Sequence, residues 1–485
     1  FVQSANAVVA ERHAGLFDDV GEWSDQRALR DVAASTGDPD LPRLVFEYLP
    51  LTFSRRHGDP SRPWNRFAIH VRDDEGHQLL SYEGNWRDLF QNWEALLASF
   101  PTYHANVVAK FVNASTLDGH NPYRISRDGV DWEVPDPDDP WSNIGYWGDH
   151  QIVYLLRLLE AWDAHEPGAI AAWLDAPLFT YADVPYTLAD HDDIVTDPRD
   201  TISYDTARAE AIATRVGAVG SDGKLVVDAD GEIVRVGLGE KLLVPALAKL
   251  SSFVPGGGIW MNTQRPEWND ANNALAGPGL SMVTLYHLRR YVRFLRTLVA
   301  GESIRLGGSV AQWLADVTGA LADADPAVAV VDEVVRRELV DGLGRAGEAH
   351  RRRLQGGVDR SITTLSTHEV PAWCDLVLTH LDATAAAGRR PDGLYHSYNL
   401  VSFTDERRAT VAHLGPMLEG QVAIISSGIL EPGESLDVVD ALYDSSMYRP
   451  DVDSFMLYPA LELSPFLDRN VVDDEIWPVG SPVAL

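Results

Sequence analysis

Apolar residues recur along much of this chain three and four positions apart, which is the period of a helix that buries one face. Residues 148–165, "GDHQIVYLLRLLEAWDAH", show the pattern at Ile152, Leu155, Leu156 and Leu159. The same spacing predicts further helices over 206–217, 239–252, 279–299, 309–323, 328–354, 369–388 and 434–447. Ser435 has the residue type of an N-cap for the last of these helices. The hydrophobic pattern therefore predicts a mainly α protein.

Few segments alternate in the manner of β-strands. Residues 224–238, "KLVVDADGEIVRVGL", hold two β-rich runs around Asp-Gly, which predicts a small β-hairpin insertion near 222–238. Short strands are also predicted within 42–54 and 65–73. Many helices of roughly 12 to 20 residues predict stacked helical hairpins, and an α/α barrel is one closed arrangement of them. An open solenoid is the alternative, although the sequence shows no repeat of about 30 to 50 residues.

Composition and charge narrow the range of partners. The 485 residues are 45% hydrophobic, enough to bury a large core, and carry a net charge of −32. Such a charge repels nucleic acid and anionic membranes, and no apolar run reaches the roughly 18 residues of a membrane span. We therefore expect no nucleic-acid or membrane partner, and a cytoplasmic location. Because the chain begins at Phe1 rather than Met, we expect residues to precede it; further domains of the same polypeptide or a homo-oligomer are open alternatives.

Metal and cysteine chemistry find little support in the sequence. Cys374 is the single cysteine, which excludes an internal disulfide and a zinc cluster built from cysteines. The histidines in "GDHQ" and "STHEV" lack a second histidine one helical turn away, so we expect no metal site. We also find no Gly-rich phosphate loop, and we expect no cofactor.

Three polar segments that contain tryptophan each precede or open a predicted helix. They are "YEGNWRDLFQNWEAL" (82–96), "WSNIGYWGDHQIVYLL" (141–156) and "RPEWNDANNAL" (265–275). Indole rings stack on the apolar face of a pyranose, and carboxylates and amides pair with its hydroxyls. The combination predicts a sugar-binding site. The plainer alternatives are that Asp270 caps a helix beginning near Asn272, and that Trp86, Trp93 and Trp147 are core aromatics.

The order of these motifs resembles the cellobiose phosphorylase family and its relatives, which are carbohydrate-active enzymes with an (α/α)6 barrel. "NWRDLFQNWEALLASFP" is similar to the family's helix start whose Arg and Asp hold the sugar in the −1 subsite, which implies Arg87 and Asp88. "YWGDHQIVYLLRLLEAW" is similar to a segment beside the same sugar, here Asp149 and His150. "EWNDANNAL" resembles the Asp-Trp-Asn-Asp motif whose last residue is the general acid, here Asp270, with Glu where the family has its first Asp.

The resemblance covers about residues 80 to 300 and implies a domain organisation. We expect an N-terminal segment or linker over 1–80, an (α/α)6 catalytic barrel over 81–470 with the hairpin inserted, and a C-terminal tail over 471–485. The family's N-terminal β-sandwich is not found in this sequence.

The resemblance also implies cleavage of a glycosidic bond of a gluco-oligosaccharide with inversion at the anomeric carbon. Asp270 would protonate the leaving oxygen, and Glu419 in "MLEGQ" is the candidate that activates water, with Glu431 and Glu369 as rivals. The expected substrate-binding residues are Trp86, Arg87, Asp88, Gln91, Trp147, Asp149, His150, Trp268 and Asn269.

Other functions fit the same sequence features. In a phosphorolytic variant, inorganic phosphate would replace water as co-substrate, although the family's late Thr-Gly pair is not found after residue 390. A sugar epimerase, using histidines for proton transfer, is a second alternative; the candidates are His104, His120, His150 and His396. The third is a non-catalytic glycan-binding barrel.

Overall fold

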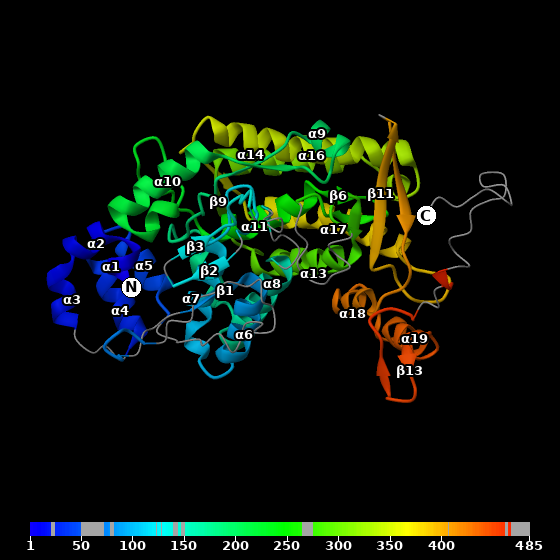
Figure 1. Cartoon of the computed structure of the whole chain (residues 1–485), viewed down its shortest axis with the longest axis horizontal. Coiled ribbons are helices and arrows are strands. Elements are labelled where there is room, and N and C mark those ends of the chain that lie inside the picture. Colours follow the sequence, from blue (N-terminus) through cyan, green and yellow to red (C-terminus); the bar gives the residue numbers. More distant parts are fainter. Residues whose placement is uncertain are drawn as a thin grey trace, which may run out of the picture.

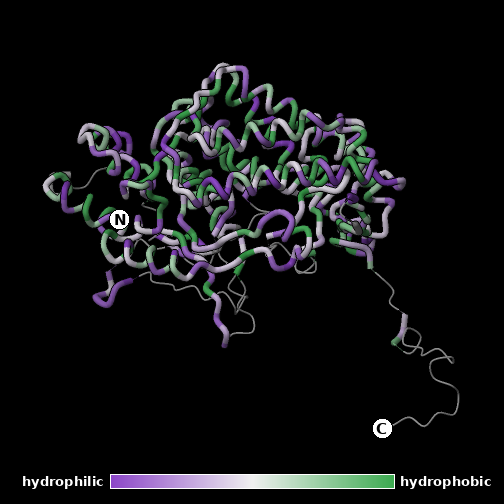
Figure 2. The backbone as a smooth tube through the Cα atoms, turned by 90° about the horizontal axis from the view of Figure 1, so that it is seen from above, coloured by the Kyte–Doolittle hydropathy of each residue, from purple (hydrophilic) through white to green (hydrophobic). Residues whose placement is uncertain are grey.

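Helices dominate the computed structural model, as the hydrophobic pattern predicts (Figure 1). The structure describes residues 1–20, 25–49, 72–77, 82–122, 124–127, 129–138, 144–146, 151–263, 275–405, 407–460 and 464–466. Figure 2 shows hydrophobic and hydrophilic residues alternating along the helical coils, as expected where each helix buries one side. The described residues do not show a closed ring of six helical hairpins.

The first five helices form a small unit with its own hydrophobic core. They are α1 (Val2–Ala5), α2 (Ala7–Arg12), α3 (Ala14–Val20), α4 (Gln26–Ser35) and α5 (Leu41–Glu47). Their shared buried residues are Ala5, Val9, Ala33, Leu41, Leu44 and Val45. The strand predicted from residue 42 onward is wrong as far as Glu47. Pro42 stands in the first turn of α5, and Leu41, Leu44 and Val45 have the helical spacing that buries them together.

The large core lies among the longer helices that follow. They are α6 (Trp86–Leu97), α7 (His104–Asn113), α8 (Gln151–His165), α10 (Thr206–Val219), α11 (Leu238–Leu250), α13 (Met282–Leu298), α14 (Gly308–Ala322), α16 (Glu333–Gln355), α17 (Glu369–Ala387), α18 (Leu418–Ser426) and α19 (Pro432–Tyr443). Several begin and end within a few residues of the predicted ranges. The cap predicted at Ser435 is wrong, because α19 begins at Pro432 and Glu431 and Glu434 form a capping box there.

Short elements connect these helices. The helical ones are η2 (Pro101–Tyr103), α9 (His191–Thr196), η3 (Ala169–Trp173), η4 (Ser221–Lys224) and α15 (Pro326–Ala329). The strands outside the main sheet are β1 (Glu83–Asn85), β2 (Arg124–Ser126), β3 (Gly129–Asp131), β4 (Tyr186–Leu188), β5 (Ile202–Tyr204), β9 (Ile304–Gly307), β10 (Ile362–Leu365), β13 (Tyr448–Arg449) and β14 (Ser454–Phe455). Within 224–238 the chain does turn back on itself, with Val227 bridged to Ile233.

A five-stranded antiparallel sheet lies beside the helices, and the hydrophobic pattern did not predict it. Its strand order is β12 (Arg408–His413), β11 (Tyr398–Asp405), β8 (Gly279–Ser281), β7 (Gly258–Trp260) and β6 (Phe253–Val254). In the register of β11 and β8, Tyr398 stands opposite Ser281. The sheet thereby brings the C-terminal third of the chain to the start of α13.

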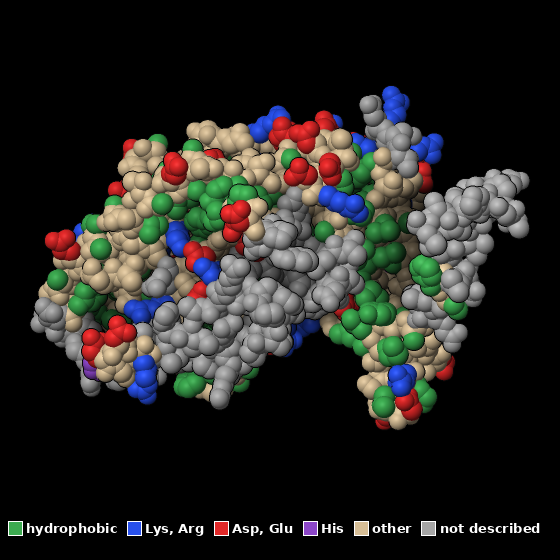
Figure 3. All heavy atoms as spheres, in the orientation of Figure 1, with side chains coloured by type: hydrophobic (Ala, Val, Ile, Leu, Met, Phe, Trp, Pro, Cys, Tyr) green, Lys and Arg blue, Asp and Glu red, His purple; other side chains and the backbone are tan. Residues whose placement is uncertain are grey.

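The surface in Figure 3 shows acidic and basic side chains in small mixed groups. Many charged side chains of the described residues form ion pairs, such as Arg305 with Asp175 and Arg352 with Glu348. Among the described residues, no helix has both the length and the hydropathy required to cross a bilayer.

Candidate functional site

Helices α6 and α8 run in the same direction, because both are antiparallel to α7. The ring of Trp86 at the start of α6 lies 4.8 Å from the ring of Phe111 near the end of α7. The ring of His104 at the start of α7 stacks 5.6 Å from that of His165, the last residue of α8. The starts of α6 and α8 therefore lie at the same end of the molecule.

Helix α13 is parallel to α8. Near their middles, Glu160 of α8 accepts two hydrogen bonds from the guanidinium of Arg290 in α13, at 2.8 and 2.7 Å. Farther along both helices, Asp163 of α8 and Thr297 of α13 line the same groove. Residue numbers therefore increase in the same direction along α8 and α13. The two helices begin at the same end of the molecule as well.

Helix α18 follows α13 in the same direction. The backbone N–H of Met282 donates to the carbonyl of Ser397 at 2.9 Å, and Ser397 Oγ accepts from the N–H of Gly420 in the first turn of α18. Beyond the end of α18, the carbonyl of Ser427 accepts from Arg289 at 2.8 Å. The four helices α6, α8, α13 and α18 thus begin at one end of the bundle, which we call the shared end.

The sequence motifs flank this shared end. Arg87 and Asp88 belong to the first turn of α6, and Asp149 and His150 immediately precede Gln151, the first residue of α8. The segment that carries Asp270 connects β7 to β8, which leads directly into α13. Its described flanks are hydrogen-bonded to each other, since Gly277 N–H donates to the carbonyl of Met261 at 3.0 Å.

The individual side chains predicted for the site divide into three groups. Trp147, Asp149, His150, Trp268, Asn269 and Asp270 lie outside the described residues. The side chains of Arg87 and Asp88 are likewise outside the description, whereas Gln91 is exposed. Trp86 is 1% exposed and packs against Phe90 and Phe111. The sugar-binding roles of these residues stay predictions.

Glu419 is held at the shared end by Tyr398. The hydroxyl of Tyr398 donates to Glu419 Oε2 at 2.6 Å, and Glu419 lies in the first turn of α18. Gln421 of α18 connects this helix to the segments before it, because its amide donates to the carbonyls of Tyr395 and Met417 at 2.7 and 2.9 Å. The sequence pattern gave no sign of Tyr398, whose role depends on pairing between distant strands.

Several buried polar atoms near the shared end have no hydrogen-bond partner in the described part of the chain. They are Trp86 Nε1, His120 Nδ1, His396 Nδ1, and both amide atoms of Gln151. His120 follows the end of α7, and its ring stacks 4.8 Å from that of Tyr146. Buried polar groups in proteins are nearly always hydrogen-bonded, so this concentration of exceptions marks a place for ligand or water.

His120 and His396 are uncharged at neutral pH. Burial lowers the pKa of His120 to about 4, with Lys249 and Arg351 acting in the same direction and Asp118 against them. Burial, and then His413, lower the pKa of His396 to about 4. The rings of His396 and His413 stack at 4.1 Å. Neutral imidazoles can both donate and accept hydrogen bonds to hydroxyl groups.

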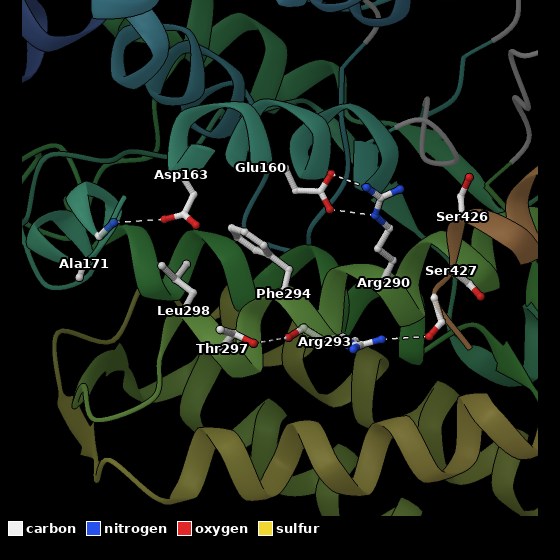
Figure 4. A pocket seen from close by; sticks show the side chains of 12 residues that line it. Glu160, Asp163, Ala171, Arg290, Arg293, Phe294, Thr297, Leu298, Ser426 and Ser427 are labelled. Atoms are coloured by element: carbon white, nitrogen blue, oxygen red, sulfur yellow. Dashed lines mark hydrogen bonds and ion pairs between the residues drawn. The ribbon is translucent and has the colours of Figure 1, made fainter. Parts of the chain in front are cut away.

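A groove of about 580 Å³ lies between α8, α13 and α18, but at their other ends (Figure 4). Asp163, one of its lining residues, is about 18 Å along α8 from Gln151 at the usual helical rise. Its charged side chains are partly satisfied within the protein, as in the pair of Glu160 and Arg290. The groove is therefore distinct from the shared end.

Among the described residues, one group of side chains has ligand atoms close enough together to bind a metal ion. Asp73, Glu75 and His77 bring ligand atoms within 4.8 Å of one another. Glu75 and His77 are exposed, and such exposed acidic groups carry no assignment by themselves.

Comparison with known proteins finds a family match for the N-terminal unit. Residues 1–50 match insertion domain 1 of glycoside hydrolase family 149. A stretch of 120 residues is 29% identical to the methionine–tRNA ligase of Nostoc sp., covering 22% of this chain and 21% of the ligase. The chain thus matches about a fifth of the length of that relative. The family match indicates a carbohydrate-active enzyme of the glycoside hydrolase or phosphorylase kind.

Proposed function

We propose that this protein cleaves a glycosidic bond of a gluco-oligosaccharide with inversion, using Asp270 as general acid and water as nucleophile. We also propose that the helices of 81–470 form an (α/α)6 barrel, with the sugar bound at the shared end and the enzyme in the cytoplasm. The observation that carries the proposal is the convergence of four helix starts, three of which adjoin the sequence motifs. Glu419 lies in the first turn of the fourth.

The proposed reaction requires two carboxyl groups on opposite sides of the bond. Asp270 would give its proton to the departing glycosidic oxygen as the bond from that oxygen to the anomeric carbon breaks. Glu419 would accept a proton from water while the water oxygen forms a bond to the same carbon from the opposite face. An inverting enzyme holds such carboxyls about 6.5 to 9.5 Å apart, which leaves room for the water.

Tyr398 supports the role proposed for Glu419 as base. Its hydroxyl donates to one carboxylate oxygen at 2.6 Å, which would hold the carboxylate in one orientation during the reaction. The remaining residues proposed to grip the sugar are Arg87, Asp88, Asp149 and His150, with Trp86, Trp147 and Trp268 at its walls and Gln91 and Asn269 as further hydrogen-bond partners.

Phosphorolysis is the second candidate, and the family match supports it as much as hydrolysis. In that reaction phosphate attacks the anomeric carbon directly, so no base is required to activate water. The high net negative charge and the short aligned stretch give no support to a function on tRNA.

The test is incubation with a panel of gluco-disaccharides of different linkage, with and without inorganic phosphate, followed by NMR of the products. Free sugar of inverted configuration in both tubes supports hydrolysis, and sugar 1-phosphate formed only with phosphate selects phosphorolysis. Glu419→Gln should abolish the first activity and spare the second.

Asp270→Asn should lower either turnover by at least about 100-fold, the scale for loss of a general acid. Asp323→Asn, at an exposed aspartate after α14, is the matched control and should leave turnover unchanged. Turnover of Asp270→Asn at the wild-type rate would remove Asp270 from the mechanism. A C2-epimerised product without bond cleavage would favour the epimerase, and sugar binding without any product would favour a glycan-binding barrel.

A further inference from the structure

Gln151 is the most isolated buried amide at the shared end. It is the first residue of α8 and only 1% exposed, yet neither its Nε2 nor its Oε1 has a hydrogen-bond partner in the described part of the chain. Leaving a buried polar group unsatisfied destabilises a fold by about 1 to 3 kcal/mol. An amide contains both a donor and an acceptor, so Gln151 combines two such penalties in one side chain.

Gln421 shows how this fold treats a glutamine that serves structure alone. It is also fully buried, at 0% exposure, but all of its hydrogen-bonding groups are used. Its amide nitrogen donates to Tyr395 and Met417, and its oxygen accepts from the N–H of Tyr395 at 2.8 Å. The contrast between two equally buried glutamines indicates that Gln151 is kept for a partner that the described residues do not supply.

The position of Gln151 indicates where that partner lies. Side chains on a helix incline toward its N-terminus, so the amide at the first residue of α8 leans toward the shared end. His120 Nδ1 and Trp86 Nε1 are unsatisfied in the same region. Three unsatisfied buried groups from the neighbourhood of α6, α7 and α8 match the needs of a ligand rich in hydroxyl groups.

We propose that Gln151 binds the sugar directly, pairing its amide oxygen and nitrogen with two adjacent hydroxyl groups of the pyranose. This assignment deepens the function proposed above and rests on it. A vicinal diol presents one hydroxyl that donates and one that accepts, and a primary amide complements both at once. Gln151 is then a residue that determines specificity for the configuration of that diol.

The first test uses stability without ligand. Gln151→Met keeps the volume and removes the unsatisfied amide, so the melting temperature should rise by about 2 °C or more. Gln421→Met is the matched control and should lower the melting temperature, because it removes satisfied hydrogen bonds and leaves their partners unpaired. A fall for Gln151→Met comparable to that of Gln421→Met would overturn the proposal, since Gln151 would then be structural.

The second test uses activity and ligand binding. On the best gluco-disaccharide of the panel, Gln151→Met should lose about 10- to 100-fold in kcat/KM. Inhibition by glucose and by its 2-, 3-, 4- and 6-deoxy analogues should show which hydroxyls matter. In the wild type, two adjacent deoxy positions should weaken inhibition, and in Gln151→Met those two analogues should inhibit as well as glucose does.

The two hypotheses fail in different ways. If wild-type protein acts on no glucoside, the proposed glycosidase function falls and the role of Gln151 falls with it. If the wild type is active but Gln151→Met keeps kcat/KM within twofold, or shows the same ranking of deoxy analogues, only the role of Gln151 is refuted.

Discussion

Replacing Arg43 with methionine should loosen the N-terminal helices from the main body. Arg43 lies on α5 and is 1% exposed, and its guanidinium donates to both carboxylate oxygens of Asp222 in η4, at 3.2 and 2.5 Å. Asn6 donates to the same carboxylate at 2.9 Å. Burial works to lower the pKa of Arg43, but Asp222 and Glu47 raise it above its ordinary value, so the guanidinium stays charged in the fold.

The expected magnitude follows from what remains after the substitution. Removing one partner of a buried ion pair usually destabilises a protein by about 3 to 5 kcal/mol, because the other charge is left uncompensated. Asn6 still donates one hydrogen bond to Asp222 in the variant, which favours the lower end, about 3 kcal/mol. Adding Asp222→Leu removes the stranded charge, so the double variant should be more stable than the single one.

The assay is urea unfolding, combined with hydrogen exchange of the amides in α5. The cluster shared by α1 to α5 is distinct from the large core, to which α5 contributes Phe46, so exchange in α5 should accelerate more than exchange in α13. The matched control is Arg296→Met. Arg296 also bonds both oxygens of an aspartate, Asp375, but the side chains are 48% and 54% exposed, so the urea midpoint should not move. Equal small effects at Arg43 and Arg296 would refute the reasoning.

Two further predictions concern the candidate base and the histidines. Tyr398→Phe removes the hydroxyl that fixes Glu419, so kcat should fall roughly 10-fold while the circular dichroism spectrum stays that of the wild type; an unchanged kcat would separate Tyr398 from the reaction. Burial, assisted by Arg290 and Arg157, lowers the pKa of His287 to about 4. The unfolded chain therefore binds an extra proton between about pH 6.5 and pH 4, and stability is lost as the pH falls through that range. His287→Gln should flatten the slope of unfolding free energy against pH by up to about 1.4 kcal/mol per unit, and an unchanged slope would contradict the burial argument.

The helices were predictable because their information is local. A buried face recurs every three or four residues, and α8 and α13 followed that pattern closely. The main sheet was not predictable, because β6, β7 and β8 have only two or three residues each, too few to display an alternation. Helix α5 was misjudged since its apolar run suits either structure, and packing against the core of the N-terminal unit decides it.

The candidate site also contains features that a local sequence pattern reveals and features that depend on distant contacts. The three motif segments were recognisable because each combines indole, carboxylate and amide groups within a few residues. Gln151 could not be singled out, since a glutamine at a helix start is ordinary until its lack of partners is known. Tyr398 depends on strand pairing with Ser281, which no local pattern encodes.

Side-chain hydrogen bonds cross-link α6, α8 and α13 between the shared end and the groove. Arg157 of α8 donates to Glu94 of α6 at 2.8 Å, and Glu160, one turn later, binds Arg290 of α13 through two hydrogen bonds. A bidentate pair fixes direction as well as distance, so the pair of Glu160 and Arg290 opposes sliding of α8 along α13. The axial positions of α8 and α13 relative to each other are then set near the middle of the two helices. In the function proposed above, groups at the starts of α6, α8 and α13 bind one sugar together, so these cross-links would contribute to the alignment of those groups.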